Sequence, residues 1–187
     1  SDIGQWVYAL APASGWDVGK GTDGTLVFGP IGAAASTQFE NSCWDSNNNV
    51  YVGVRNTVTG AVTIYGYTKA GVALGTPFPI TGISSSTVAG RRVVGMTICN
   101  GFLFIGVILT AAVDSRIHRV SLTSGVVDLN YITTANVGFI FGNAAVNAIC
   151  GCGTLLGIEN VGTGTNQIFM IFDTVSQTLK TNTTYGG

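Results

Sequence analysis

The sequence predicts an all-β fold, and three observations lead to this prediction. Val, Ile, Thr, Tyr and Phe, which favour strands, occur in short runs separated by clusters of Gly, Asn, Ser and Thr. No window shows the sustained spacing of apolar residues at three and four positions that an amphipathic helix requires. A segment of about 50 residues recurs three times along the chain, which is typical of a repeat architecture.

Composition narrows the class of protein further. The 187 residues suit a single domain, and 46% hydrophobic against 9% charged residues argue against disorder. A net charge of −1 gives no electrostatic footprint for nucleic acid, so we expect no nucleic-acid partner. The glycine-containing segments fall between expected strands and precede no helix, so we expect no phosphate loop. The apolar run 102–109 is too short to cross a bilayer as a helix. A surface with so few charges is common on secreted β-proteins and virion components, and it favours self-association.

The repeat is clearest around three cysteines. Cys43, Cys99 and Cys150 each precede a polar or glycine-rich turn, an apolar run and then a glycine. That glycine follows the cysteine by seven residues in the last two copies and by ten in the first. We expect the three cysteines to be small buried groups at equivalent positions, with a disulfide between repeats as the alternative.

A second recurring block, 63–71, 117–125 and 168–176, follows each cysteine segment. Together with a strand before each cysteine and one after each block, this gives four strands per unit. The last strands are expected at 73–80, 126–132 and 178–184. The predicted units are 37–90, 91–142 and 143–187, within one domain that covers 1–187.

In the first repeat, a strand at 49–52 is followed by a loop, a second strand at 63–67 and a Gly turn. This order of strands and turns resembles the YVTN-type and NHL-type β-propeller repeats. The resemblance covers residues 37–187 and implies three four-stranded antiparallel blades. The N-terminal segment 1–36 is expected to add two strands, 5–10 and 24–28, joined by a loop that contains Trp16, Gly19 and Gly21. Because three blades do not close a ring, this segment either forms a partial blade or pairs with another subunit. A β-sandwich is the alternative fold.

No residue pattern points to catalysis. His118 is the only histidine and occupies a strand position, which excludes a multi-histidine metal site. The pair Cys150 and Cys152 lacks the second ligand pair of a zinc site, and the Asp45 turn lacks the glutamate of a calcium loop. We therefore expect no catalytic residue, no metal and no cofactor. A glycoside hydrolase with distant carboxylates is the third hypothesis, because two acids can come from separate strands.

Three tryptophans are the best candidates for a ligand-facing surface. Trp6, Trp16 and Trp44 could anchor protein or sugar contacts through their flat faces, or could pack in the core. The first hypothesis is a non-catalytic structural or assembly protein of a virion or cell surface that contacts protein subunits, including copies of itself. The second is a propeller module that binds carbohydrate or peptide.

Overall fold

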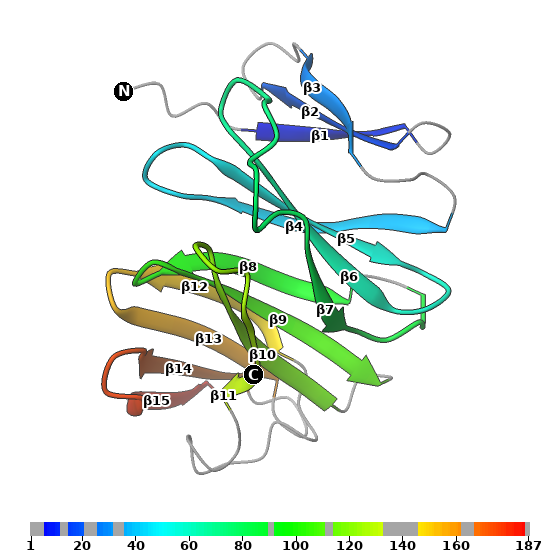
Figure 1. Ribbon diagram of the computed structural model, residues 1–187. Helices are drawn as coiled ribbons and strands as arrows, with labels where there is room; N and C mark the ends of the chain where they lie inside the picture. Colours follow the sequence, from blue (N-terminus) through cyan, green and yellow to red (C-terminus); the bar gives the residue numbers. More distant parts are fainter. Residues whose placement is uncertain are drawn as a thin grey trace.

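The fold is all-β, as the sequence predicts (Figure 1). The computed structural model describes residues 6–11, 15–20, 26–31, 36–89, 92–110, 114–132, 146–161 and 167–185. Within these ranges the chain forms one three-stranded sheet and three four-stranded sheets, and no helix. Every strand pair in the four sheets is antiparallel, and neighbours in sequence are neighbours in the sheet.

The sheets follow one another along the chain. The N-terminal sheet contains β1 (Trp6–Ala11), β2 (Gly15–Lys20) and β3 (Leu26–Ile31). The second contains β4 (Thr37–Trp44), β5 (Val50–Asn56), β6 (Ala61–Tyr67) and β7 (Ile80–Ser84). The third contains β8 (Val93–Cys99), β9 (Phe102–Thr110), β10 (Asp114–Ser121) and β11 (Val127–Ile132). The fourth contains β12 (Val146–Cys152), β13 (Leu155–Val161), β14 (Gln167–Asp173) and β15 (Thr178–Tyr185).

The sheets stack face to face in a propeller-like arrangement. The first strand of each four-stranded sheet contacts the first strand of the next, β4 with β8 and β8 with β12, so these strands form the inner edge of the stack. We call the face that each sheet turns to the next sheet its front face, and the opposite face its back face. Figure 1 shows β1–β3 at one end of the stack and β12–β15 at the other.

Apolar side chains fill the space between the sheets. Tyr51 and Ile64 on the front of β4–β7 pack with Leu103 and Ile105 on the back of β8–β11. The next junction has the same design, and its members are Phe104, Ile117 and Ile132 against Leu156, Ile158, Met170 and Phe172. On the back of β4–β7, Val50, Val52 and Val54 form a third buried cluster. Each junction therefore joins a front face to a back face by burial of apolar surface.

The connections between strands divide the stack into two sides. We call the side with the β4–β5, β6–β7, β8–β9, β10–β11, β12–β13 and β14–β15 connections the turn side. Hydrogen bonds tie these turns together: the amide of Asn100 donates to the carbonyl of Gly153 at 2.9 Å, and that of Thr174 to the carbonyl of Thr154 at 2.9 Å. The β8–β9 turn is the Asn100–Gly101 pair, with φ values of 49° and 75°, which suit a tight two-residue hairpin.

Two predicted elements are wrong. The expected N-terminal loop contains strand β2, which includes Trp16 and Gly19, because Gly15 and Gly19 lower the strand propensity of the segment without preventing pairing with β1. The strand expected at 73–80 begins only at Ile80. Pro77 and Pro79 have no amide hydrogen to donate to a sheet ladder, and the whole segment 68–79 connects β6 to β7, with Ala73 in an isolated bridge to Tyr67.

Candidate functional site

The three tryptophans that the sequence suggests for a ligand-facing surface lie at different places in the fold. Trp6 pairs with Lys20 at one end of the β1–β2 hairpin, whereas Trp16 pairs with Leu10 near the other end. Their side chains lie outside the described part of the structure. Trp44 is the last residue of β4, on the turn side, and its side chain is 52% exposed. Trp44 is therefore the one tryptophan for which the structure describes a solvent-facing ring.

The repeat cysteines differ in their surroundings. Cys43 and Cys99 are buried, as expected, but Cys150 is exposed, as is Cys152, so the expectation of three equivalent buried cysteines is wrong. Cys152 pairs with Leu155 just before its turn, as Cys99 pairs with Phe102, so Cys152 rather than Cys150 occupies the position that matches Cys99. All four thiols are free.

His118 has a structural environment. Its ring is buried, and Nδ1 accepts a hydrogen bond from the amide of Asn130 at 2.9 Å. Burial, and to a smaller extent Arg116, lower the pKa of His118 to about 4, while Asp128 opposes the shift. The imidazole is therefore neutral at pH 7 and accepts a backbone hydrogen bond through the nitrogen that a metal or a proton would need.

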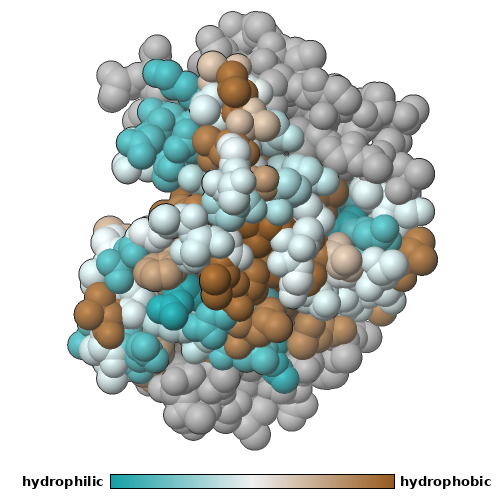
Figure 2. All heavy atoms as spheres, viewed as in Figure 1, coloured by the Kyte–Doolittle hydropathy of each residue, from teal (hydrophilic) through white to brown (hydrophobic). Residues whose placement is uncertain are grey.

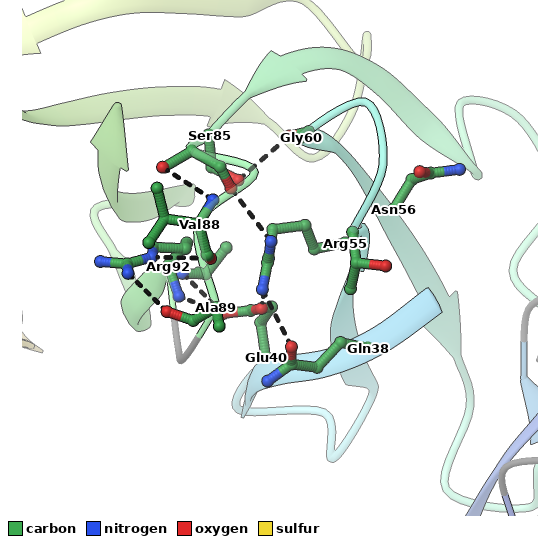
Figure 3. A network of polar contacts seen from close by, with 12 residues as sticks. Gln38, Glu40, Arg55, Asn56, Gly60, Ser85, Val88, Ala89 and Arg92 are labelled. Carbon is green, nitrogen blue, oxygen red and sulfur yellow. Dashed lines mark hydrogen bonds and ion pairs between the residues drawn. The ribbon is translucent and has the colours of Figure 1, made fainter. Parts of the chain in front are cut away.

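A buried polar network lies near the β5–β6 turn, on the side opposite the turn side, and Figure 3 shows it from close by. Nε of Arg55 donates to Oε1 of Glu40 at 2.6 Å, and Nη1 and Nη2 donate to the carbonyl of Ser86 and to Oε1 of Gln38. The other carboxylate oxygen of Glu40 accepts the amide hydrogens of Arg92 and Val93. Glu40 thereby ties β4 and β5 to the start of β8. With both charged groups buried and hydrogen-bonded, the network fastens two sheets together.

The remaining carboxylates offer no assembled centre. Among the described residues, no group of three or more His, Cys, Asp and Glu side chains could hold a metal ion. Asp45 accepts hydrogen bonds from its own turn and from Tyr51, and Asp128 and Asp173 pair with Arg119 and Lys180. Within the same ranges, no helix is long and apolar enough to span a membrane.

The front face of the fourth sheet is open. In β5, Val50 to Arg55 are all buried, and in β9 Leu103 to Ile108 are all buried, so both strands are covered on both faces. In β13, Leu156 and Ile158 are the buried residues among 155–159, the part of the strand whose burial is described, while Leu155 is 39% exposed. The sheet β12–β15 is therefore covered on its back face by β8–β11 and leaves its front face accessible, which explains the exposure of Cys150 and Cys152.

The turn side carries a repeated set of exposed apolar side chains. Val72, Val126 and Val175 lie in the connections between the third and fourth strands of the three four-stranded sheets, and they are 64%, 64% and 63% exposed. Trp44 and Leu155 lie on the same side, at the turns between first and second strands. In Figure 2, exposed hydrophobic residues lie among weakly polar ones across the visible surface. Sequence reasoning missed the three valines, although each follows the strand of the second repeated block.

Comparisons with known proteins identify a shared fold and no family. No family model matches the sequence, and no curated protein matches it either. A protein of unknown function from Bacteroides caccae matches with a TM-score of 0.51 and 12% identity, over 98% of this chain and 62% of that chain. A Bacteroides ovatus protein described as a dipeptidyl aminopeptidase IV candidate matches over 96% of this chain and 34% of that chain, with 12% identity. Its TM-score of 0.28 is too low to support a shared fold. The chain thus spans about three-fifths of the length of the first protein, with which it shares the fold alone.

Proposed function

We propose that this chain is a non-catalytic structural module of the β-propeller repeat type, which makes protein–protein contacts in a virion or cell-surface assembly. The observation that carries the proposal is the set of three equally exposed valines at equivalent turns, Val72, Val126 and Val175. Together with Trp44 and Leu155 they form an apolar set on the turn side. Exposed apolar groups gathered on one side of a soluble domain are typical of an interaction surface.

The polar groups support the same proposal. The neutral, buried His118 and the fully hydrogen-bonded Glu40 have structural partners, so neither is available as a general acid or base at the surface. The low net charge of −1 leaves little repulsion between copies or between subunits of an assembly.

Site-specific photo-crosslinking tests this function. A benzophenone amino acid placed at Val126 or Val175 should form protein adducts in the native assembly at a yield at least tenfold above that at Val58. Val58 is the matched control, because it is 69% exposed and lies at the β5–β6 turn on the opposite side. Equal yields at the three positions, or no protein adduct from Val126 and Val175, would contradict the proposal.

A carbohydrate-binding role is the second candidate, and the exposed ring of Trp44 favours it. Trp44 directly precedes the turn 45–49, in which the polar residues Ser46, Asn47 and Asn48 are exposed. Sugar binding commonly combines such a ring with neighbouring hydrogen-bonding groups. A glycan array should then give signals that Trp44→Ala abolishes and Val58→Ala leaves unchanged. An array without a specific signal would exclude this candidate.

A further inference from the structure

We propose that Arg119 is the recognition residue of a carboxylate-binding site on the turn side, and that the site takes an Asp or Glu side chain flanked by apolar side chains in a partner subunit. The inference rests on the proposed function, because it names the chemistry of the partner that the apolar set on the turn side contacts. The guanidinium of Arg119 lies at the junction of the third and fourth sheets, and its surroundings point to this ligand.

The register of the third sheet brings the guanidinium to the turn side. Arg119 lies on the front face of β10, because it is the direct partner of Phe104, whose ring is buried against the fourth sheet. Its Cζ lies over the ring of Phe102, the first residue of β9, at 4.7 Å from the centroid. Cζ also lies 4.2 Å from the centroid of the Tyr131 ring. Contacts with two aromatic rings hold the cation at this end of the sheet.

The ring of Tyr131 is itself anchored to the fourth sheet. Its hydroxyl donates to the carbonyl of Thr174, in the β14–β15 connection, at 2.9 Å. Its ring packs edge to face with Phe172, with the centroids 6.1 Å apart. The aromatic support of Arg119 is therefore built from both sheets before any ligand binds. A binding group that is already ordered loses less conformational entropy on binding than a free side chain does.

The guanidinium retains hydrogen-bond donors that no described protein atom takes up. Nη2 donates to Oδ2 of Asp128 at 3.1 Å, and the Tyr131 hydroxyl is the other polar side-chain group beside the cation. A guanidinium carries five N–H donors, so these two partners leave part of its planar fork unused among the described residues. The Arg119 side chain is 27% exposed, so a ligand can reach the guanidinium from solvent.

A carboxylate is the ligand that these donors fit best. Guanidinium and carboxylate groups pair through two parallel N–H···O bonds, and the single bond to Asp128 does not use this geometry. The ion pair of Arg119 with Asp128 carries no net charge. A phosphate group, with its larger negative charge, would be repelled by Asp128 more strongly than a carboxylate would. The site therefore favours a singly charged, planar anion.

Exposed valines border the site on both sheets. Val126 precedes Asp128 by two residues, and Val175 directly follows Thr174. These valines are 64% and 63% exposed. A polypeptide that places apolar side chains on both valines would carry the side chain between them to the guanidinium. A carboxylate at a chain terminus has polypeptide on one side alone, so the two valines favour an acidic side chain within the partner chain. Arginine beside apolar groups is typical of the centres of protein interfaces.

Titration of the full chain with defined peptides tests the inference. The probe is the pentapeptide Ser-Val-Glu-Val-Ser with both ends blocked, and its match has Gln in place of Glu. The Glu peptide should bind about tenfold more tightly, because its contact with the cation is charge-assisted. Arg119→Met should remove this difference, and Arg119→Lys should retain only part of it. Asp128→Asn should tighten binding of the Glu peptide about threefold, because a competing carboxylate is lost.

Lys69→Met is the control, because it removes an exposed positive charge from the β6–β7 connection on the same side, and it should leave both affinities unchanged. Circular dichroism verifies that each variant is folded. Equal affinities for the two peptides, no binding of the Glu peptide, or weaker binding by Asp128→Asn would overturn the inference. Equally tight binding of the Gln peptide with a free C-terminal carboxylate would overturn the assignment to a side chain.

Photo-crosslinking separates this inference from the proposed function. In the native assembly, Arg119→Met should lower the yield of protein adducts from Val126 about tenfold. If the adducts keep their full yield in this variant and the two peptides bind alike, the carboxylate site is wrong and the proposed function stands. Absence of protein adducts from Val126 in the parent chain would instead overturn the proposed function, and the partner subunit with it.

Discussion

Glu40 and Arg55 form a buried ion pair, with Nε of Arg55 2.6 Å from Oε1 of Glu40 and both side chains almost fully removed from solvent. The same carboxylate accepts the amide hydrogens of Arg92 and Val93, at the start of β8. One side chain of β4 therefore fixes the entry of the following sheet. The pair holds the inner edge of the stack together, where β4 meets β8.

Removing one charge of this pair should destabilise the fold strongly. Glu40→Gln removes the negative charge that pairs with the buried Arg55 guanidinium, and we expect a loss of about 3–5 kcal/mol in the free energy of unfolding in urea. Asp128→Asn is the control, because Asp128 and Arg119 are partly exposed, and it should cost no more than about 1 kcal/mol. Equal losses in the two variants would show that the buried pair has no special role. The double variant Glu40→Gln, Arg55→Met should lose less than the sum of its single variants.

The buried imidazole of His118 should make stability depend on pH. Because burial lowers its pKa in the folded chain to about 4, the unfolded chain, with a pKa near 6.5, binds the proton first as the pH falls. The stabilising contribution is complete above about pH 6.5 and is lost between about pH 6.5 and 4, which amounts to about 3 kcal/mol. Unfolding curves of His118→Gln should show a correspondingly shallower loss over this range. An identical pH dependence in both proteins would contradict the assignment.

Gly151 should not tolerate a side chain. A Cβ at this position would lie 2.7 Å from the carbonyl oxygen of Ile98 in β8, which is backbone and cannot turn away. Gly151→Ala should therefore cost about 1–3 kcal/mol as the two inner strands separate. Gly75→Ala meets no atom within 4 Å and should leave the melting temperature unchanged or slightly raised. A melting temperature of Gly151→Ala within error of the parent would refute the contact between β12 and β8.

Replacement by serine should reduce stability more at Cys43 than at Cys99. Cys43 lies in an apolar cluster with Tyr51 and Ile64, so Cys43→Ser should cost about 1–3 kcal/mol for an unpaired hydroxyl. Sγ of Cys99 already donates to the carbonyls of Gly153 and Leu155, at 3.2 and 3.3 Å. A serine at position 99 finds the same acceptors, and its cost should be clearly smaller. Chemical denaturation of both variants measures the difference, and the reverse order would contradict these environments.

Much of the fold follows from local sequence. Period-two runs and turn residues identify the strands on either side of each predicted turn. The recurrence of the blocks predicts that these strands group into four-stranded sheets. Strand β2 does not follow from the sequence pattern, because Gly15 and Gly19 remove two of the side chains on which a strand prediction depends. The extent of β7 was missed because Pro77 and Pro79 interrupt the ladder within an otherwise apolar run.

The candidate surfaces could be predicted only in part. Sequence comparison placed Cys150 with Cys43 and Cys99, yet burial of a cysteine depends on whether another sheet covers its face, which spacing along the chain does not encode. The pairing of Glu40 with Arg55 joins residues 15 positions apart on neighbouring strands, and it depends on the register of β4 with β5. The valines of the turn side could be predicted only in part: Val72 and Val126 directly follow the second repeated block, whereas Val175 lies within it, so the repeat does not align all three.

The reactivity of the native cysteines tests the stacking of the sheets most directly. Labelling with a maleimide at high dilution, where single chains prevail, should modify Cys150 and Cys152 rapidly, because the front face of β12–β15 is open. Cys43 and Cys99 should react only after denaturant unfolds the chain, since a following sheet covers each of them. Mass spectrometry of the digested protein assigns each site. Rapid labelling of Cys43 or Cys99 in the folded chain, or protection of Cys150 and Cys152 in the single chain, would contradict the front-to-back stack.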